Sequence, residues 1–283
     1  MADRRAIGMF DSGVGGLSVM REIRRLLSRE DILYLADTAH CPYGTRTREE
    51  IQQLTGAIAE FLISQGAKLI VVACNTASVA SLPYLRAKFS VPFVGMVPAV
   101  KPAASASQAR RVGVMATNAT FQGEMFDDLV QRFAADVQVV KQVCPGLVHA
   151  VEKGELDTVE TKRLLAEYVQ PLVEARVDTI VLGCTHYVFL RSDIEEIVGP
   201  AVAVIDSGQA VARQVARVLR ERGLENTSAI QGQNQYFTTG DAEQVAAVIS
   251  RLTGEVSPAV ASVRLSFADS AIIRDSELRE EKQ

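Results

Sequence analysis

Residues 67–76 read AKLIVVACNT, and residues 177–186 read VDTIVLGCTH. In both stretches a short apolar run ends at a cysteine, and polar residues follow at once. A run of this length without polar alternation is typical of a parallel strand that is covered on both faces. The two cysteines, Cys74 and Cys184, lie 110 positions apart. The two stretches therefore predict two buried strands, each with a thiol at the point where the strand ends.

Similar apolar runs recur at residues 6–10, 32–36, 93–97, 112–116, 137–140 and 202–205. Segments with helical spacing lie between them, as at residues 17–27, where Leu17, Met20 and Ile23 share one face. The other such segments are residues 50–65, 77–89, 122–133, 159–175, 189–198 and 209–221. This alternation predicts the α/β class with parallel sheets, and ligand sites at the carboxyl ends of the strands.

Further landmarks repeat in the same order. Residues 7–10 and 112–115 form similar runs 105 positions apart, and Cys41-Pro42 precedes Cys144-Pro145 by 103 positions. A period this long indicates two similar α/β domains related by pseudo-symmetry, with the active site in the cleft between them. We expect the first domain to comprise residues 1–97 and 207–268, and the second residues 98–206. Residues 98–107 resemble a linker, and residues 269–283 a frayed, charge-rich tail.

Composition narrows the class of protein. The chain has 283 residues, of which 48% are hydrophobic and 23% charged, as in soluble globular proteins. Its net charge of −4 and its lack of tryptophan argue against nucleic-acid binding. The sequence contains neither a membrane-length apolar run nor a signal peptide. Four cysteines are too few for a disulfide scaffold, so we expect free thiols in a cytoplasmic protein without nucleic-acid or membrane partners.

A glycine-rich motif, DSGVGGL at residues 11–17, follows the first predicted strand and opens a helix. Its backbone N–H groups could approach an anion at the start of that helix. The dinucleotide fingerprint fails because Ser18 stands where the third glycine would be required. A carboxylate therefore fits better, and a purely structural turn is the alternative.

The duplicated thiols suggest a particular chemistry. A helix N-terminus after each strand is expected to lower the pKa of the thiol from about 8.5 toward neutrality. A lone buried cysteine is usually part of a core, but two at equivalent positions would face each other across the cleft. Such a pair can remove a proton from one face of a carbon and deliver another to the opposite face. Asp11 is the natural partner of Cys74, and His186 that of Cys184.

Four motifs together carry a resemblance. DSGVGGL at 11–17, CPYG at 41–44, CNTA at 74–77 and GCTH at 183–186 are similar to the signature set of glutamate racemases, in the cofactor-independent aspartate/glutamate racemase superfamily. The match extends to about Ser266. The resemblance implies interconversion of L- and D-glutamate without a cofactor, with D-glutamate supplied for peptidoglycan synthesis, cell-wall biogenesis and cell shape. It also implies a homodimer.

The resemblance further implies residue roles. Cys74 would act as the acid/base residue on the D face and Cys184 on the L face, assisted by Asp11, His186 and Glu152. The implied substrate contacts are Asp11, Ser12, Tyr43, Gly44, Asn75, Thr76, Thr185 and His186. We interpret the remaining cysteines and histidines as structural: Cys41, Cys144, His40 and His149.

Other readings stay open at this point. The chain could be a racemase of aspartate or another amino acid, or a related decarboxylase, although a decarboxylase needs only one of the thiols. A thiol hydrolase with a Cys–His–Asp arrangement would leave the second cysteine unexplained. A non-catalytic modulator could use its negative charge to bind a basic protein surface. Pyridoxal phosphate is disfavoured because only Lys101 lies near a strand end, and the His and Cys spacing suggests no metal.

Overall fold

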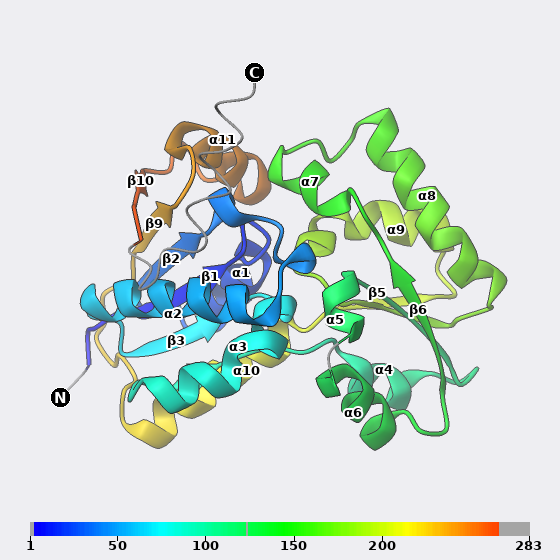
Figure 1. Cartoon of the computed structure of the whole chain (residues 1–283), viewed down its shortest axis with the longest axis horizontal. Helices are drawn as coiled ribbons and strands as arrows, with labels where there is room; N and C mark the ends of the chain where they lie inside the picture. Colours follow the sequence, from blue (N-terminus) through cyan, green and yellow to red (C-terminus); the bar gives the residue numbers. More distant parts are fainter. Residues whose placement is uncertain (1–2, 123, 266–283) are drawn as a thin grey trace.

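The computed structural model describes residues 3–122 and 124–265 and forms two lobes, each built on a parallel sheet (Figure 1). The first sheet has the order β10-β9-β2-β1-β3-β4 and the second the order β6-β5-β7-β8. The strands of the first sheet are β1 Ile7–Asp11, β2 Ile32–Ala36, β3 Leu69–Val72, β4 Phe93–Val94, β9 Asn234–Thr238 and β10 Val260–Ser262. Those of the second are β5 Arg111–Ala116, β6 Gln138–Val143, β7 Thr179–Leu182 and β8 Ala203–Ile205.

The two sheets share one topology. The order β2-β1-β3-β4 in the first lobe repeats as β6-β5-β7-β8 in the second, and every pairing is parallel. The cysteine-bearing strands β3 and β7 are equivalent, since each pairs with the first strand of its own lobe. The prediction of two similar parallel-sheet α/β domains is therefore confirmed.

Eleven α-helices are assigned in the described residues. They are α1 Leu17–Leu26, α2 Arg48–Ser64, α3 Asn75–Lys88, α4 Val100–Ala106, α5 Asn118–Gln122, α6 Glu124–Phe133, α7 Leu147–Glu152, α8 Val159–Glu174, α9 Arg191–Val198, α10 Gly208–Arg222 and α11 Ala242–Thr253. Three short 3₁₀ segments are η1 Thr38–His40, η2 Tyr43–Thr45 and η3 His186–Leu190. Helix α1 buries Leu17, Met20 and Ile23 on one face, as the spacing predicted.

Two local expectations were wrong. Much of the stretch read as a linker, residues 98–107, forms helix α4, whose small residues Ala103 and Ala104 are buried against the second lobe. Strand β6 is not covered on both faces, because it is an edge strand with exposed or half-buried polar residues such as Gln138 and Lys141. The expected tail, residues 269–283, lies outside the described residues.

The C-terminal segment adds to the first lobe. Strand β9 pairs in parallel with β2, and β10 with β9, so these strands lengthen the first sheet at its edge. Lys68 and Glu30, both almost fully buried, form an ion pair of 2.6 Å beneath this region. Glu30 also accepts a hydrogen bond from the backbone N–H of Asn226, at 2.7 Å. A buried charge pair thus helps to hold the returning chain.

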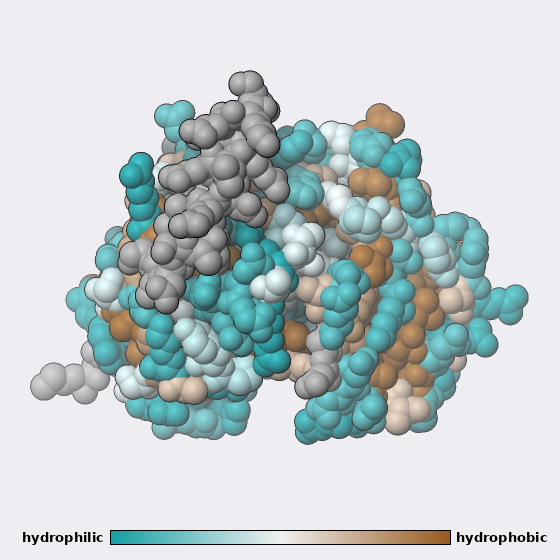
Figure 2. All heavy atoms as spheres, in the orientation of Figure 1, coloured by the Kyte–Doolittle hydropathy of each residue, from teal (hydrophilic) through white to brown (hydrophobic). Residues whose placement is uncertain are grey.

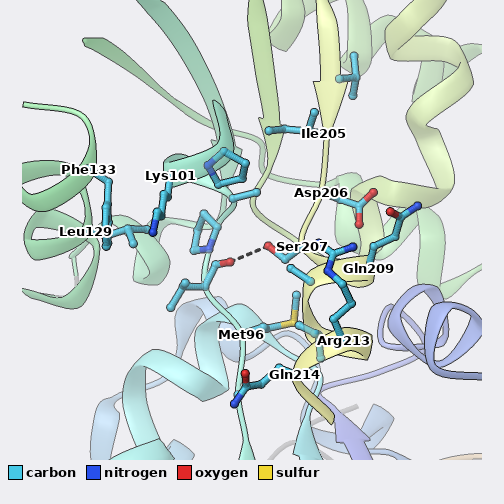
Figure 3. A pocket seen from close by; sticks show the side chains of 18 of the residues that line it. Met96, Lys101, Leu129, Phe133, Ile205, Asp206, Ser207, Gln209, Arg213 and Gln214 are labelled. Carbon is cyan, nitrogen blue, oxygen red and sulfur yellow. Dashed lines mark hydrogen bonds between the residues drawn. The ribbon is translucent and has the colours of Figure 1, made fainter. Parts of the chain in front are cut away.

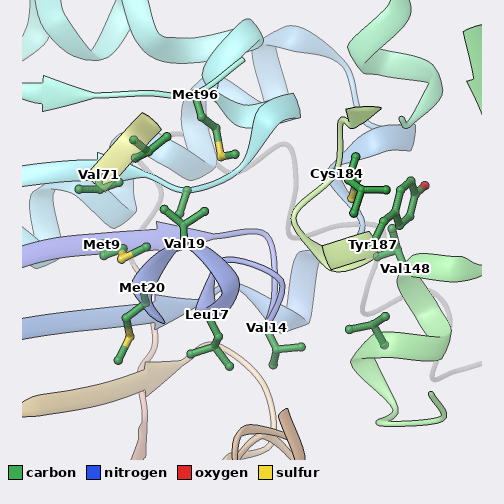
Figure 4. Close-up of a cluster of buried hydrophobic side chains, with 14 of the residues drawn as sticks. Met9, Val14, Leu17, Val19, Met20, Val71, Met96, Val148, Cys184 and Tyr187 are labelled. Atoms are coloured by element: carbon green, nitrogen blue, oxygen red, sulfur yellow. The ribbon is translucent and has the colours of Figure 1, made fainter. Parts of the chain in front are cut away.

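The apolar core continues from one lobe into the other. Met9, Leu17 and Met20 of the first lobe belong to the same buried cluster as Val148 and Tyr187 of the second (Figure 4). On the face shown in Figure 2, hydrophilic side chains cover most of the surface and a notch separates the lobes. Among the described residues, no helix combines the length and apolar character that crossing a membrane would require.

Candidate active site

Cys74 lies at the junction of β3 and α3. It is the N-cap residue of α3, and its Sγ accepts a hydrogen bond from the backbone N–H of Ala77 at 3.4 Å. The expected lowering of its pKa was wrong. Burial and the negative charge of Asp11 raise the pKa of Cys74 well above the usual value, although the Ala77 N–H opposes them. Because desolvation outweighs the helix terminus, Cys74 is a protonated thiol at neutral pH in this closed site.

Cys184 occupies the equivalent position after β7, with His186 beside it. Its Sγ lies 3.7 Å from Nδ1 of His186, and Nε2 of that ring lies 2.5 Å from Oε1 of Glu152. Burial opposes the charged form of His186, but hydrogen bonds with Cys184, Cys41 and Glu152 outweigh it and raise the pKa of His186 well above its usual range. His186 therefore places a positive charge directly beside the Cys184 sulfur.

Asp11 ends β1 and is fully buried between the two lobes. Its Oδ1 accepts a hydrogen bond from the backbone N–H of Ser12 at 2.7 Å, and its Oδ2 accepts one from Oγ1 of Thr185 at 3.0 Å. Burial raises the pKa of Asp11, while the positive charge of His186 and a hydrogen bond with Cys74 lower it in part. The carboxylate is therefore in contact with the surroundings of both thiols.

The glycine-rich loop holds a carboxylate, and that carboxylate belongs to the protein itself. The backbone N–H of Val14 donates a 2.7 Å hydrogen bond to Oε1 of Glu152 in the other lobe. A Cβ atom on Gly13 would lie 2.0 Å from the same oxygen, and one on Gly15 would lie 2.3 Å from Nδ1 of His186. A side chain at either position would displace side chains of the second lobe, which pack directly onto this loop.

Both thiols face one small cavity of about 10 Å³. Of the residues predicted from sequence, Ser12, Tyr43, Gly44, Cys74, Asn75, Thr76, Cys184, Thr185 and His186 line it. Asp11 and Glu152 stand one hydrogen bond behind the lining, on Thr185 and His186 respectively. The Tyr43 hydroxyl group is engaged elsewhere, since it donates to Asp37 at 2.5 Å. A cavity of this volume has room for about one water molecule.

Asn75 and a cluster of three threonines supply polar groups at this cavity. Asn75 is 3% exposed, and neither its side-chain oxygen nor its nitrogen has a hydrogen-bond partner among the described residues. Oγ1 of Thr76 lies 3.0 Å from that of Thr117 and 3.3 Å from that of Thr120. The threonines join the two lobes through hydroxyl groups, and Asn75 retains hydrogen-bonding capacity for a ligand.

Sequence reasoning missed several neighbours of the site. Thr117, Pro42, Val148 and Gly183 also line the cavity, and Thr120 contacts Thr117 at 3.0 Å. The repeat in the sequence contained a signal for Thr117. Thr117 directly follows β5, just as Ser12 directly follows β1, and the two residues are 105 positions apart, like the strands themselves. Cys41, read as structural, is close enough to His186 to affect its pKa.

A much larger cavity, of about 600 Å³, lies where the chain crosses between the lobes (Figure 3). Met96, Lys101, Phe133 and Arg213 line it, and Oγ of Ser207 donates a 2.6 Å hydrogen bond to the carbonyl oxygen of Val97 at its wall. Among the described residues that line this cavity there is no cysteine. The residues that the sequence predicted for the site therefore gather at the small cavity and not at this larger one.

Comparisons with known proteins identify the family of this chain. Residues 7–215 match the model of the Asp/Glu/hydantoin racemase family. A glutamate racemase of Herpetosiphon aurantiacus is 55% identical over 235 residues, which cover 83% of this chain and 92% of that protein. The crystal structure of glutamate racemase isoform RacE1 from Bacillus anthracis has a TM-score of 0.85 at 33% identity, covering 93% of this chain and 98% of the other. That of Escherichia coli glutamate racemase, in complex with L-glutamate and the activator UDP-MurNAc-ala, has a TM-score of 0.80 at 33% identity, covering 94% and 100%.

Proposed function

The chain belongs to the glutamate racemases of the Asp/Glu/hydantoin racemase family, and we propose that Cys74 and Cys184 carry out its reaction as two opposed acid/base residues. The observation that supports this most is that two equivalent strands, β3 and β7, bring both thiols to one cavity. Each thiol also has its own titratable partner, Asp11 for Cys74 and His186 for Cys184.

The protonation states suit the two roles. With L-glutamate bound, the Cys184 thiolate takes the α-proton, so that an S–H bond forms as the C–H bond breaks. The Cys74 thiol then gives its proton to the opposite face of the carbon and becomes a thiolate. The reverse reaction exchanges the roles. Cys74 as the starting acid agrees with its raised pKa, and His186, 3.7 Å from the Cys184 sulfur, is placed to assist the opposite thiol.

Polar groups around the thiols would bind the charged substrate. Asn75 and Thr76 at the start of α3, with Thr185 after β7, offer hydrogen-bond donors for the carboxylates of glutamate. Ser12, Tyr43 and Gly44 line the other part of the cavity. Asp11 stands behind the lining in the closed structure, and we propose that it accepts from the ammonium group when the substrate is bound. We assign the substrate contacts predicted from sequence to these positions, and add Thr117.

Substrate entry requires the lobes to part, because a cavity of about 10 Å³ cannot admit glutamate. The contacts to be broken include those from Val14 to Glu152 and from Thr185 to Asp11. Opening would expose the cavity to solvent, and closure would exclude water from the reacting carbon.

The cellular setting follows from the same proposal. The enzyme would act in the cytoplasm as a homodimer and without a cofactor. The D-glutamate that it makes would serve peptidoglycan synthesis. We retain residues 1–97 with 207–268, and residues 98–206, as the two domains that move against each other. The reading as a thiol hydrolase or a non-catalytic modulator has no support from the curated relatives, which are glutamate racemases.

The substrate is tested by incubating the purified protein with L-glutamate, and in parallel with L-aspartate, in the presence of reductant and a chelator. Loss of optical activity with glutamate alone is the expected result. Racemisation of aspartate at an equal or greater rate would refute the substrate assignment while leaving the two-thiol chemistry in place.

A further inference from the structure

Three potential metal ligands meet beside the thiol cavity. Cys41 lies between η1 and η2 in the first lobe, Glu152 ends α7 and His186 begins η3 in the second. One ligand atom from each residue lies within 4.8 Å of the other two. Sequence spacing did not suggest a metal site, since the three residues are spread over 146 positions and only the folding of two lobes joins them.

We propose that Cys41, Glu152 and His186 bind a thiophilic divalent cation of the zinc type, in a site that bridges the lobes and blocks the reaction. Metal binding does not depend on the proposed function, whereas the inhibition of racemisation rests on that function. Metal bound at this site would inhibit the enzyme, because His186 and Glu152 would then no longer be available to assist Cys184.

The donor set fits this class of cation. Thiolate sulfur, imidazole nitrogen and carboxylate oxygen are the three ligand types that zinc uses in proteins, at about 2.0–2.3 Å. Tetrahedral bonds of that length separate the ligand atoms by about 3.3–3.8 Å, which small side-chain movements can reach from the present spacing. Three protein ligands leave a fourth position for water. Harder cations such as magnesium prefer oxygen ligands and would be rejected.

The surroundings orient one of the ligands in advance. Oε1 of Glu152 accepts the backbone N–H of Val14 at 2.7 Å, which fixes the carboxylate between the lobes. Such outer contacts strengthen metal sites because they reduce the freedom of the ligand. The cluster is also partly accessible, since Cys41 and Glu152 are only half-buried.

Metal binding would disable the enzyme in two ways. It would take up the ring nitrogen and carboxylate through which His186 and Glu152 support Cys184, and it would tie Cys41 of one lobe to the other lobe. Binding would release one proton from the Cys41 thiol and one from the His186 ring, since only the thiolate and the neutral imidazole nitrogen can ligate the cation.

Cobalt(II) serves as a spectroscopic probe of the site. The full-length protein, in a phosphine reductant that binds metal weakly, is titrated with cobalt(II) and the near-ultraviolet band of thiolate-to-cobalt charge transfer is followed. Zinc is then added to displace the cobalt. The variants are Cys41→Ser, the cavity-thiol variants Cys74→Ser and Cys184→Ser and, as a control for a buried thiol outside the cluster, Cys144→Ser.

The wild type and Cys144→Ser should show the band, and zinc should abolish it. In Cys41→Ser the metal affinity should fall at least about 10-fold, because losing even an outer partner of a ligand costs about 10- to 100-fold. Zinc should inhibit racemisation by the wild type, and a chelator should restore the rate. With each rate expressed relative to the same protein without metal, half-inhibition of Cys41→Ser should need at least about 10-fold more zinc.

Two outcomes would overturn the proposal. One is a band that Cys41→Ser retains at wild-type affinity. The other is a band that is lost in Cys74→Ser or Cys184→Ser and kept in Cys41→Ser, which would place the metal between the reacting thiols. A Cys41-dependent band in a protein that racemises nothing would support the metal site and count against the proposed function alone.

Discussion

Thr185 of the second lobe donates a 3.0 Å hydrogen bond from its Oγ1 to Oδ2 of Asp11 in the first. Thr185 directly follows Cys184, and the charge of Asp11 acts on Cys74. One buried bond thus connects the surroundings of the two thiols. It also places a carboxylate where no solvent can stabilise its charge, which has a measurable effect on stability.

Asp11→Asn should remove a pH-dependent destabilisation. Burial raises the pKa of Asp11, so the stability that this group contributes is present below its unfolded pKa of about 3.9 and is lost as pH rises through the folded pKa. Asparagine does not ionise, so the variant does not lose this stability. Its free energy of unfolding, measured in urea at several pH values, should rise relative to wild type as pH rises above about 4.

The racemase activity of Asp11→Asn should fall at the same time. Exposed Asp157, replaced by Asn, provides the control and should show no comparable gain in stability. A stability difference between Asp11→Asn and wild type that stays constant from acid to neutral pH would contradict the role given to burial.

Glu152→Gln should lower the pKa of His186. The hydrogen bond from Glu152 is one of the interactions that raise this pKa against burial, and a neutral amide supports the imidazolium less well. NMR titration of the His186 ring should show the shift to lower pH. The rate with L-glutamate should fall by about 10²-fold or more, the usual contribution of acid/base assistance.

Glu155→Gln is the matched control, because Glu155 is exposed just beyond the same helix. It should leave both the His186 titration and the rate unchanged. An unaltered His186 titration in Glu152→Gln would show that other groups hold the imidazolium.

Gly15→Ala should impair activity far more than stability. The added methyl group would lie 2.3 Å from Nδ1 of His186, so the lobes could not close in this arrangement. A misplacement of about 1 Å can cost about 10²-fold in rate. The kinetic constants and the urea midpoint should be measured together.

Gly66→Ala should impair stability and leave activity unaffected. Its φ of +86° disfavours alanine by about 1 kcal/mol, but no atom of the described part of the chain lies within 4 Å of the new methyl group. Activity per folded molecule should therefore be unchanged. Equal activity losses in the two variants would argue against contact between the loop and His186 during catalysis.

The sequence predicted much of the fold because its signals are local. The apolar runs ending at Cys74 and Cys184 reveal strands and their ends, and the repeated landmarks reveal the second domain. The pKa of Cys74 was mispredicted because burial and the charge of Asp11 depend on how the lobes close. The position of Cys41 near Glu152 and His186 could not be predicted either, because residues spread over 146 positions of the sequence meet only when the two lobes pack together.

Lys68→Met should destabilise the first lobe strongly. Lys68 pairs with Glu30 at 2.6 Å with both side chains buried, so the substitution would leave an unpaired buried carboxylate. Such a change costs about 3–5 kcal/mol. Lys88→Met is the comparison, because its pair with Glu60 is about half exposed and is worth about 1 kcal/mol or less. Urea unfolding would measure both, and similar small losses would mean that the buried pair is dispensable.

The central claim is that two thiols act on opposite faces of one carbon. The most direct measurement follows L-glutamate in deuterated buffer by NMR and optical activity, from the earliest turnovers. Two-thiol transfer predicts that the D-glutamate formed carries deuterium at its α-carbon while the remaining L-glutamate keeps its proton, and that Cys74→Ser and Cys184→Ser each abolish racemisation. D-glutamate that retains the original proton, or a serine variant that racemises at the wild-type rate, would contradict the account.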